Sequence, residues 1–118
     1  METRIKGVFR GGEPSGTSLK GEIEASYADL VALLGEPQYK VDRRNPQSDG
    51  KCSTEWNLTC DGRVFTLYDY KKTSLYDPDL PSPAEFRALP SYSWHIGARD
   101  GVEPFLNLLE SALAGLKK

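Results

Sequence analysis

The middle of the chain carries the clearest alternation of apolar and polar residues. Residues 54–60 and 63–70 each alternate, and the dipeptide Asp61-Gly62 separates them. Such a dipeptide between two alternating runs is typical of a β-hairpin with a two-residue turn, because both turn positions need positive φ. The pattern therefore predicts two antiparallel strands joined by a tight turn.

The tight turn determines which residues of the two strands lie opposite each other. Trp56 is expected opposite Leu67 and Leu58 opposite Phe65, which gives the hairpin one apolar face for the core. Because side chains alternate between the two faces of a strand, the other face is polar. It is expected to carry Glu55, Asn57, Thr59, Val64, Thr66, Tyr68 and Tyr70.

A second pair of alternating runs lies near the N-terminus. Residues 3–10 and 17–24 alternate, and residues 11–16 between them are rich in Gly, Pro and Ser. Two short strands around a turn-rich segment favour a hairpin. We therefore predict a hairpin over residues 3–24.

Two segments have the spacing of apolar residues that is typical of amphipathic helices. The first, residues 26–35, begins with Ser26, which suits a helix N-cap. The second, residues 100–117, is strongly amphipathic and has Asp100 and Glu103 at its start, where acidic groups suit the helix dipole. We predict a short helix and a C-terminal helix.

The remaining segments are predicted from prolines and short alternating runs. Residues 71–90 contain four prolines and are expected to form an irregular loop with one helical turn at residues 82–85. Strands are expected within residues 39–70 and over residues 91–97. The predicted fold is α+β, with one antiparallel sheet of about five to six strands packed with the two helices.

The composition suits one globular domain. The chain has 118 residues, of which 38% are hydrophobic and 27% are charged. A chain of this length can bury one core but not two. We expect a single domain over residues 1–118, since no internal repeat or long linker divides it.

Neither a membrane span nor an export signal is predicted. The longest apolar run, residues 30–34, is far shorter than the roughly 20 residues that a membrane helix needs. The N-terminus has no hydrophobic signal region, so we expect a cytoplasmic protein with no membrane partner. A net charge of −2 provides no broad positive field, and we expect no duplex nucleic acid as a partner.

Catalytic and metal chemistry find little support in the sequence. Cys52 and Cys60 would lie roughly 25 Å apart on one extended segment, which is too far for a disulfide, so free thiols are expected. His95 is the only histidine, and zinc-ligand spacing, a serine nucleophile signature and a Walker loop are all missing. We expect a protein that is not an enzyme, with no cofactor and no metal.

The polar face of the central hairpin is the first candidate binding surface. Tyr68 and Tyr70 offer flat stacking surfaces, and Lys71 follows them with a positive charge. Aromatic rings beside a cation suit a nucleotide-like ligand, whose base stacks while its phosphates pair with Lys or Arg. The alternative is that the two tyrosines pack beneath a helix.

Three residues near the last strand complete the candidate ligand-binding set: Trp94, His95 and Arg99. Strand alternation places Trp94 on one face and His95 on the other. Arg99 is expected at the N-terminal end of the last helix, where a guanidinium and backbone amides together suit a phosphate. The alternatives are a half-exposed strand histidine and a surface arginine at a helix end.

Several short motifs occur in an order that resembles a family of bacteriophage and prophage proteins. They are Leu33-Leu34-Gly35-Glu36-Pro37, Lys40-Val41-Asp42, Thr54-Glu55-Trp56, the run from Asp61 to Lys71, and Trp94-His95-Ile96-Gly97. On these motifs the chain resembles the Thoeris anti-defence sponge proteins, which sequester cyclic ADP-ribose-type immune signals without cleaving them. Some of these proteins also hold cyclic oligonucleotides. The chain departs from the family pattern at Ala98, where a second glycine is usual, and in its longer polar loop over residues 43–53.

The resemblance implies an antiparallel sheet with helices that associates into dimers or larger assemblies, with pockets at subunit interfaces. It also implies a small-molecule nucleotide signal as the partner, in an infected or lysogenic bacterial host. An alternative function is a small inhibitor that binds a host defence nuclease through its surface, as anti-CRISPR proteins do. A purely structural oligomer also stays open.

Overall fold

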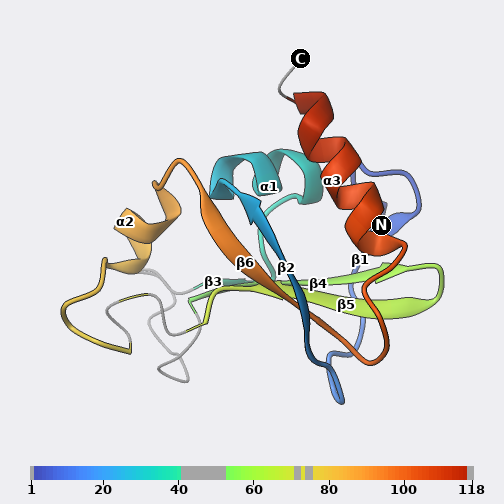
Figure 1. Cartoon of the computed structure of the whole chain (residues 1–118), viewed down its shortest axis with the longest axis horizontal. Helices are drawn as coiled ribbons and strands as arrows, with labels where there is room; N and C mark the ends of the chain where they lie inside the picture. The colour runs from blue at the N-terminus through green and yellow to red at the C-terminus, as the bar shows by residue number, and fades with distance from the viewer. Residues whose placement is uncertain (1, 41–52, 71–72, 74–75, 117–118) are drawn as a thin grey trace.

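Six antiparallel strands and three helices make up the described part of the chain (Figure 1). The computed structural model describes residues 2–40, 53–70, 73 and 76–116. In chain order the elements are β1 (Val8–Arg10), β2 (Ser18–Ala25), α1 (Tyr27–Leu34), β3 (Tyr39–Lys40), β4 (Thr54–Cys60), β5 (Arg63–Tyr68), α2 (Pro83–Arg87), β6 (Tyr92–Ala98) and α3 (Phe105–Leu116). The predicted α+β class with one antiparallel sheet is confirmed.

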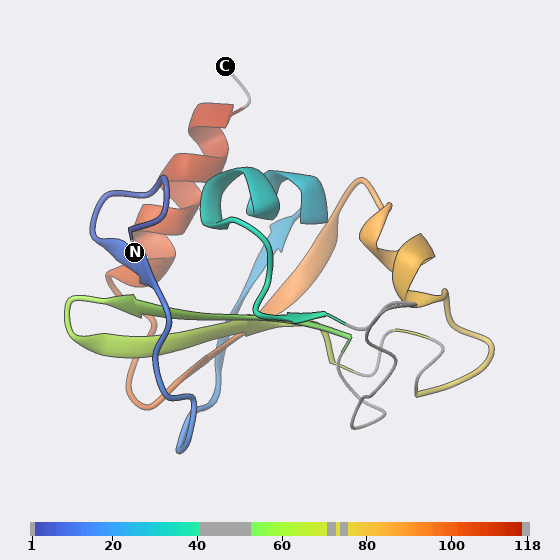
Figure 2. The ribbon, with the colours of Figure 1, turned by 180° about the vertical axis from the view of Figure 1, so that it is seen from behind.

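The two longer helices cover one face of the sheet. The strand order is β1-β4-β5-β6-β2, with β3 beside β4. Figures 1 and 2 show α1 and α3 on the same side of this sheet, seen from two opposite directions. Apolar side chains of β4 and β5 face these helices and are fully buried: Trp56, Leu58, Phe65 and Leu67 are each 0% exposed. Burying a side chain of this kind contributes roughly 1.5–3 kcal/mol.

The central hairpin forms as predicted. Trp56 pairs with Leu67 and Leu58 with Phe65 across β4 and β5. The turn residues Asp61 and Gly62 have φ values of 55° and 77°, the positive values that a two-residue hairpin turn requires. This part of the register depends only on local sequence.

The predicted N-terminal hairpin over residues 3–24 is wrong. β1 pairs with β4 and β2 pairs with β6, so the two strands lie at opposite edges of the sheet. Four strand spacings separate these edges, roughly 19 Å. The chain from Arg10 to Ser18 can span about 26 Å when extended, which is enough to cross the sheet. Residues 11–17 make this crossing, and we call them the strap.

The predicted short helix and the predicted helical turn are both present. α1 begins after Ser26, whose side chain accepts a hydrogen bond from the Asp29 amide. α2 has a full capping box between Ser82 and Glu85, with Pro83 in its first turn. Of the helices in the described ranges, none is long and apolar enough to cross a membrane.

The C-terminal helix begins later than the sequence predicted. α3 starts at Phe105 and not at residue 100, so Asp100 and Glu103 precede the helix. Pro104 gives the physical reason, because a residue that precedes proline is disfavoured in the α conformation. The apolar stripe of this helix is nevertheless in the core, since Phe105 and Leu109 are 0% exposed.

Candidate functional site

The sheet face opposite α1 and α3 carries the candidate site. Here the cross-strand register places four side chains in one row: Glu55, Tyr68, His95 and Glu22. They come from four neighbouring strands, β4, β5, β6 and β2. The row begins and ends with a carboxylate, with two ring side chains between them.

The structure brings three of the predicted ligand-binding residues together. The ring centroids of Tyr68 and His95 are 5.6 Å apart and nearly perpendicular, and those of Tyr70 and His95 are 6.0 Å apart. All three side chains are half-buried, so part of each ring faces solvent. We call Tyr68, Tyr70 and His95 the aromatic group. Neither tyrosine packs beneath a helix, because both helices cover the opposite face.

Glu22 was missed as a site residue by the sequence analysis. Its Oε1 atom lies 3.4 Å from Nε2 of His95, and its side chain is 56% exposed. Alternation within residues 17–24 places Glu22 on a polar face. The sequence analysis paired this strand with residues 3–10, so it did not predict that Glu22 lies beside His95. Only the β2–β6 pairing brings it beside the aromatic group.

Trp94 does not belong to this surface. It lies in the core on the other face of β6, 1% exposed, and its indole N–H donates to the Ala25 carbonyl at 3.0 Å. The alternation along residues 92–96 predicted the two faces correctly. The inclusion of Trp94 in a ligand site is not supported by this burial.

Arg99 is separated from the aromatic group and holds the strap. Its Nε and Nη2 atoms donate to the carbonyls of Ser15 and Glu13 at 2.8 and 2.7 Å. It does not stand at a helix N-terminus, because α3 begins only at Phe105. Lys71, the sixth predicted ligand-binding residue, lies outside the described residues.

The strap covers one end of the sheet face. Gly11 donates its amide to the Asn57 carbonyl at 2.8 Å, and a Cβ atom added at Gly12 would lie 3.3 Å from side-chain atoms of Thr59 and Val64. Hydrogen bonds from Ser15 lower the pKa of the Glu13 carboxyl within the strap. The aromatic group lies farther along the strands, away from these contacts.

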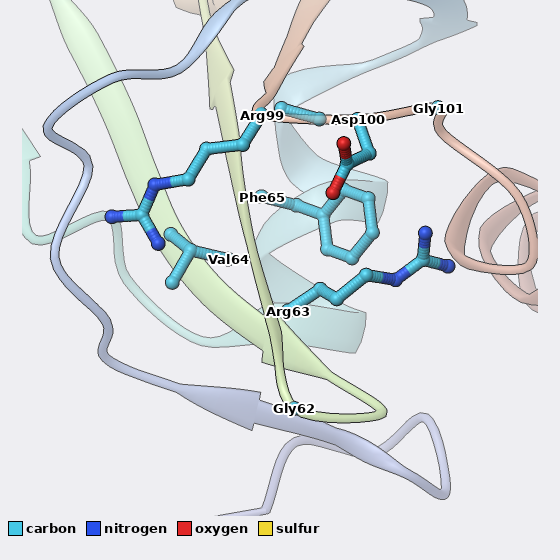
Figure 3. Close-up of a pocket in the computed structure, with 8 residues that line it drawn as sticks. Gly62, Arg63, Val64, Phe65, Arg99, Asp100 and Gly101 are labelled. Atoms are coloured by element: carbon cyan, nitrogen blue, oxygen red, sulfur yellow. The ribbon is translucent and has the colours of Figure 1, made fainter.

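Three hollows lie elsewhere on the described surface. The first, about 100 Å³, lies at the ends of β5 and β6, where Arg63 and Arg99 flank Asp100 (Figure 3). It is smaller than the roughly 300–1,000 Å³ typical of a ligand pocket. The others, about 470 and 290 Å³, lie beside α1 at residues 31–35 and near Leu113. None of the three is lined by a member of the aromatic group.

Metal and thiol chemistry find no centre among the described residues. Within those ranges, no group of three or more His, Cys, Asp or Glu side chains is placed to hold a metal ion. Cys60 is a buried free thiol, and burial raises its pKa. A thiol in such surroundings is a poor nucleophile. Cys52 lies outside the described residues.

Gly97 lies opposite Thr66, next to the aromatic group on the same sheet face. We expect Gly97→Ala to destabilise the protein by about 1–3 kcal/mol, as overpacking usually does. A Cβ atom at Gly97 would overlap Oγ1 of Thr66 and lie 3.4 Å from Cε1 of Tyr68. Urea denaturation measures the change. The matched control is Gly101→Ala, where an added Cβ meets nothing within 4 Å. Equal stability of the two variants would contradict this expectation.

Comparison with known proteins found no relative of the chain. No family model matches the chain, and no curated protein sequence matches it.

Proposed function

We propose that the chain is a non-catalytic, phage-type anti-defence protein that sequesters a cyclic nucleotide immune signal in the cytoplasm of its bacterial host. The aromatic group on the sheet face opposite α1 and α3 is the observation that carries this proposal. Its rings come from neighbouring strands and are partly open to solvent. Stacking one base on an aromatic side chain typically contributes about 1–3 kcal/mol.

The proposal includes a second copy of the chain over this face. An open sheet face can stack a base on one side only, and none of the three hollows includes the aromatic group. A two-fold partner would add a second wall made of the same side chains. Lys71 remains our expected contact for a phosphate, together with cations of the second copy.

Thermal denaturation in the presence of cyclic ADP-ribose isomers and cyclic di- and trinucleotides tests the proposal. A ligand present at about 100 times its Kd should stabilise the protein by roughly 2.7 kcal/mol. Chromatography of the ligand afterwards should recover it unchanged. Consumption of the ligand would contradict a non-catalytic role. If none of these nucleotides raises the melting temperature, nucleotide binding is contradicted.

Tyr70→Ala is the matched test of the aromatic group. We expect this variant to lose most of the ligand-induced shift, because it removes one ring of the stacking surface. Tyr76→Ala is the control, since Tyr76 is 51% exposed and lies outside the aromatic group. Both variants should be compared with the wild type for stability without ligand, so that a binding defect is separated from a folding defect. Equal shifts for both variants would exclude the aromatic group.

A second candidate function is an inhibitor that binds a host defence nuclease. The observation in its favour is the exposure of two large apolar side chains near the two edges of the same face, Phe9 at 43% and Leu19 at 52%. A protein interface typically buries about 800 Å² on each partner, which requires such apolar anchors on a broad surface. This function predicts a measurable complex with a nuclease and no thermal shift with nucleotides.

A further inference from the structure

A carboxylate, that of Glu22 on β2, lies at the edge of the aromatic group, where it can accept hydrogen bonds from a bound base. Glu22 lies opposite His95 in the β2–β6 register, and its carboxylate is 3.4 Å from the His95 ring nitrogen. The Glu22 side chain is 56% exposed and that of His95 is 16% exposed. A carboxylate therefore stands at the rim of the stacking surface, where a ligand can reach it.

We propose that Glu22 selects a guanine base, an inference that rests on the nucleotide-binding function proposed above. The Tyr68 ring is nearly perpendicular to the His95 ring, so a base stacks on Tyr68 alone and can turn one edge toward His95 and β2. An ionised carboxylate only accepts hydrogen bonds, and its two oxygens match two adjacent donors. Guanine offers such a pair on its Watson–Crick edge, the ring N1–H and the exocyclic N2 amino group.

The other common bases fit this carboxylate less well. Adenine and cytosine each place one amino donor beside a bare ring nitrogen, which is an acceptor. Uracil places one N–H between two carbonyl oxygens. In each case an acceptor atom of the base faces an oxygen of the carboxylate. Neither atom can donate a hydrogen bond to the other, so both are desolvated without gaining a partner. The discrimination between bases by a bidentate pair of this kind is roughly tenfold or more.

His95 is a positioning residue in this arrangement. It lies between Tyr68 and Glu22 in the row, so it contacts the stacking ring on one side and the carboxylate on the other. The 3.4 Å approach of the His95 ring nitrogen to the Glu22 carboxylate restricts the rotamers of Glu22, which reduces the entropy lost when a base binds. Glu55 ends the row on the other side of Tyr68, opposite it in the β4–β5 register, and is half-buried, whereas the Glu22 side chain is 56% exposed.

Glu22→Gln is the sharpest test, because it exchanges one acceptor for a donor at nearly constant size. A Gln side chain pairs with a donor and an acceptor together, and the Watson–Crick edges of adenine and guanine both offer such a pair, so Gln does not distinguish the two bases. Titration calorimetry of the full chain with cyclic di-guanylate and cyclic di-adenylate measures both affinities. We expect the wild type to bind cyclic di-guanylate at least about tenfold more tightly, and the variant to lose this preference.

Glu24→Gln is the matched control. Glu24 lies two residues along β2 on the same face, opposite Ser93, and its removal changes the net charge by the same amount. We expect Glu24→Gln to keep the guanine preference, so that a general change in charge is separated from base reading. Its carboxylate accepts a hydrogen bond from Ser91 at 3.3 Å and lies outside the row.

The outcomes separate the base preference from the binding function itself. Equal affinity of the wild type for the two dinucleotides overturns the guanine inference and leaves nucleotide binding intact. A guanine preference that survives in Glu22→Gln overturns the role of Glu22. Failure of the wild type to bind any cyclic nucleotide overturns the proposed function, and the guanine inference falls with it.

Discussion

Replacing Trp94 with Ala is expected to lower the free energy of unfolding by roughly 3–5 kcal/mol, the usual range for a buried tryptophan. The side chain is 1% exposed, and its ring centroid lies 5.2–5.5 Å from those of Trp56, Phe86 and Tyr92. Truncation leaves a cavity among these rings. It also removes the indole donor from the Ala25 carbonyl, which loses its 3.0 Å hydrogen bond.

Chemical denaturation monitored by far-ultraviolet circular dichroism measures this loss. Trp94→Phe is the control, because it keeps an aromatic ring in the cluster but lacks the N–H group. We expect it to be less destabilising than Trp94→Ala. A change within about 0.5 kcal/mol for the Ala variant, as is usual at a surface position, would contradict a core role. Such a small change would make Trp94 a candidate ligand contact again.

Asp69→Ala is expected to have an effect of similar size, about 3–6 kcal/mol, because it leaves three buried donors without an acceptor. Oδ1 of Asp69 accepts from the backbone amides of Ser53 and Thr54 at 2.8 Å each, and Oδ2 accepts from the Ser53 hydroxyl at 2.7 Å. All three residues are 0% exposed. This carboxylate therefore joins the end of β5 to the start of β4.

Asp69→Asn is the matched control. The amide keeps one carbonyl oxygen for the two backbone N–H groups, and its NH₂ group can donate to the Ser53 hydroxyl, which accepts as well as donates. We expect the Asn variant to retain most of the stability. Denaturation of both variants under the same conditions tests the assignment, and equal losses would contradict it.

The comparison of the wild type with Asp69→Asn gives a pH dependence with a definite sign. Burial raises the pKa of Asp69 above its ordinary value, against the opposing effect of its hydrogen bonds from Ser53 and Thr54. The folded protein then binds this proton more tightly than the unfolded chain, whose Asp pKa is about 3.9. The stabilisation that comes from this tighter proton binding by Asp69 is complete below the pKa of the unfolded chain. It is lost as the pH rises through the pKa of Asp69 in the folded protein.

Wild-type stability relative to Asp69→Asn should therefore fall as the pH is raised from about 4 toward neutrality. The Asn side chain does not titrate, so the difference between the two proteins isolates Asp69 from other carboxyls. Denaturant titrations across this range measure the difference. A difference that grows with pH would mean that the hydrogen bonds outweigh burial.

The candidate site was predictable to the extent that it depends on strand alternation. Alternation placed Tyr68 and His95 on polar faces, and both lie on the sheet face opposite α1 and α3. It also placed Trp94 on the opposite face, where it is buried. Arg99 was misplaced because its proposed role depended on a helix start that Pro104 moves to Phe105. Contacts between neighbouring strands, such as Glu22 with His95, needed the correct pairing.

The sequence by itself determined the features that depend on near neighbours in the chain. The Asp61-Gly62 turn, the facing pair of Trp56 and Leu67, the Ser26 cap and the α+β class all follow from local conformational preference or from the period of apolar residues. These preferences act over a few residues and do not require knowledge of distant partners.

Only the tertiary structure decided which strands lie side by side. Alternation distinguishes the two faces of a strand, but it carries no information about the strand that will pair with its edge. β1 and β2 are neighbours in sequence and lie at opposite edges of the sheet, because the strap is long enough to cross it. That crossing brings Glu22 beside His95 and brings the strap within hydrogen-bond distance of Arg99, so the composition of the candidate site was decided by long-range pairing.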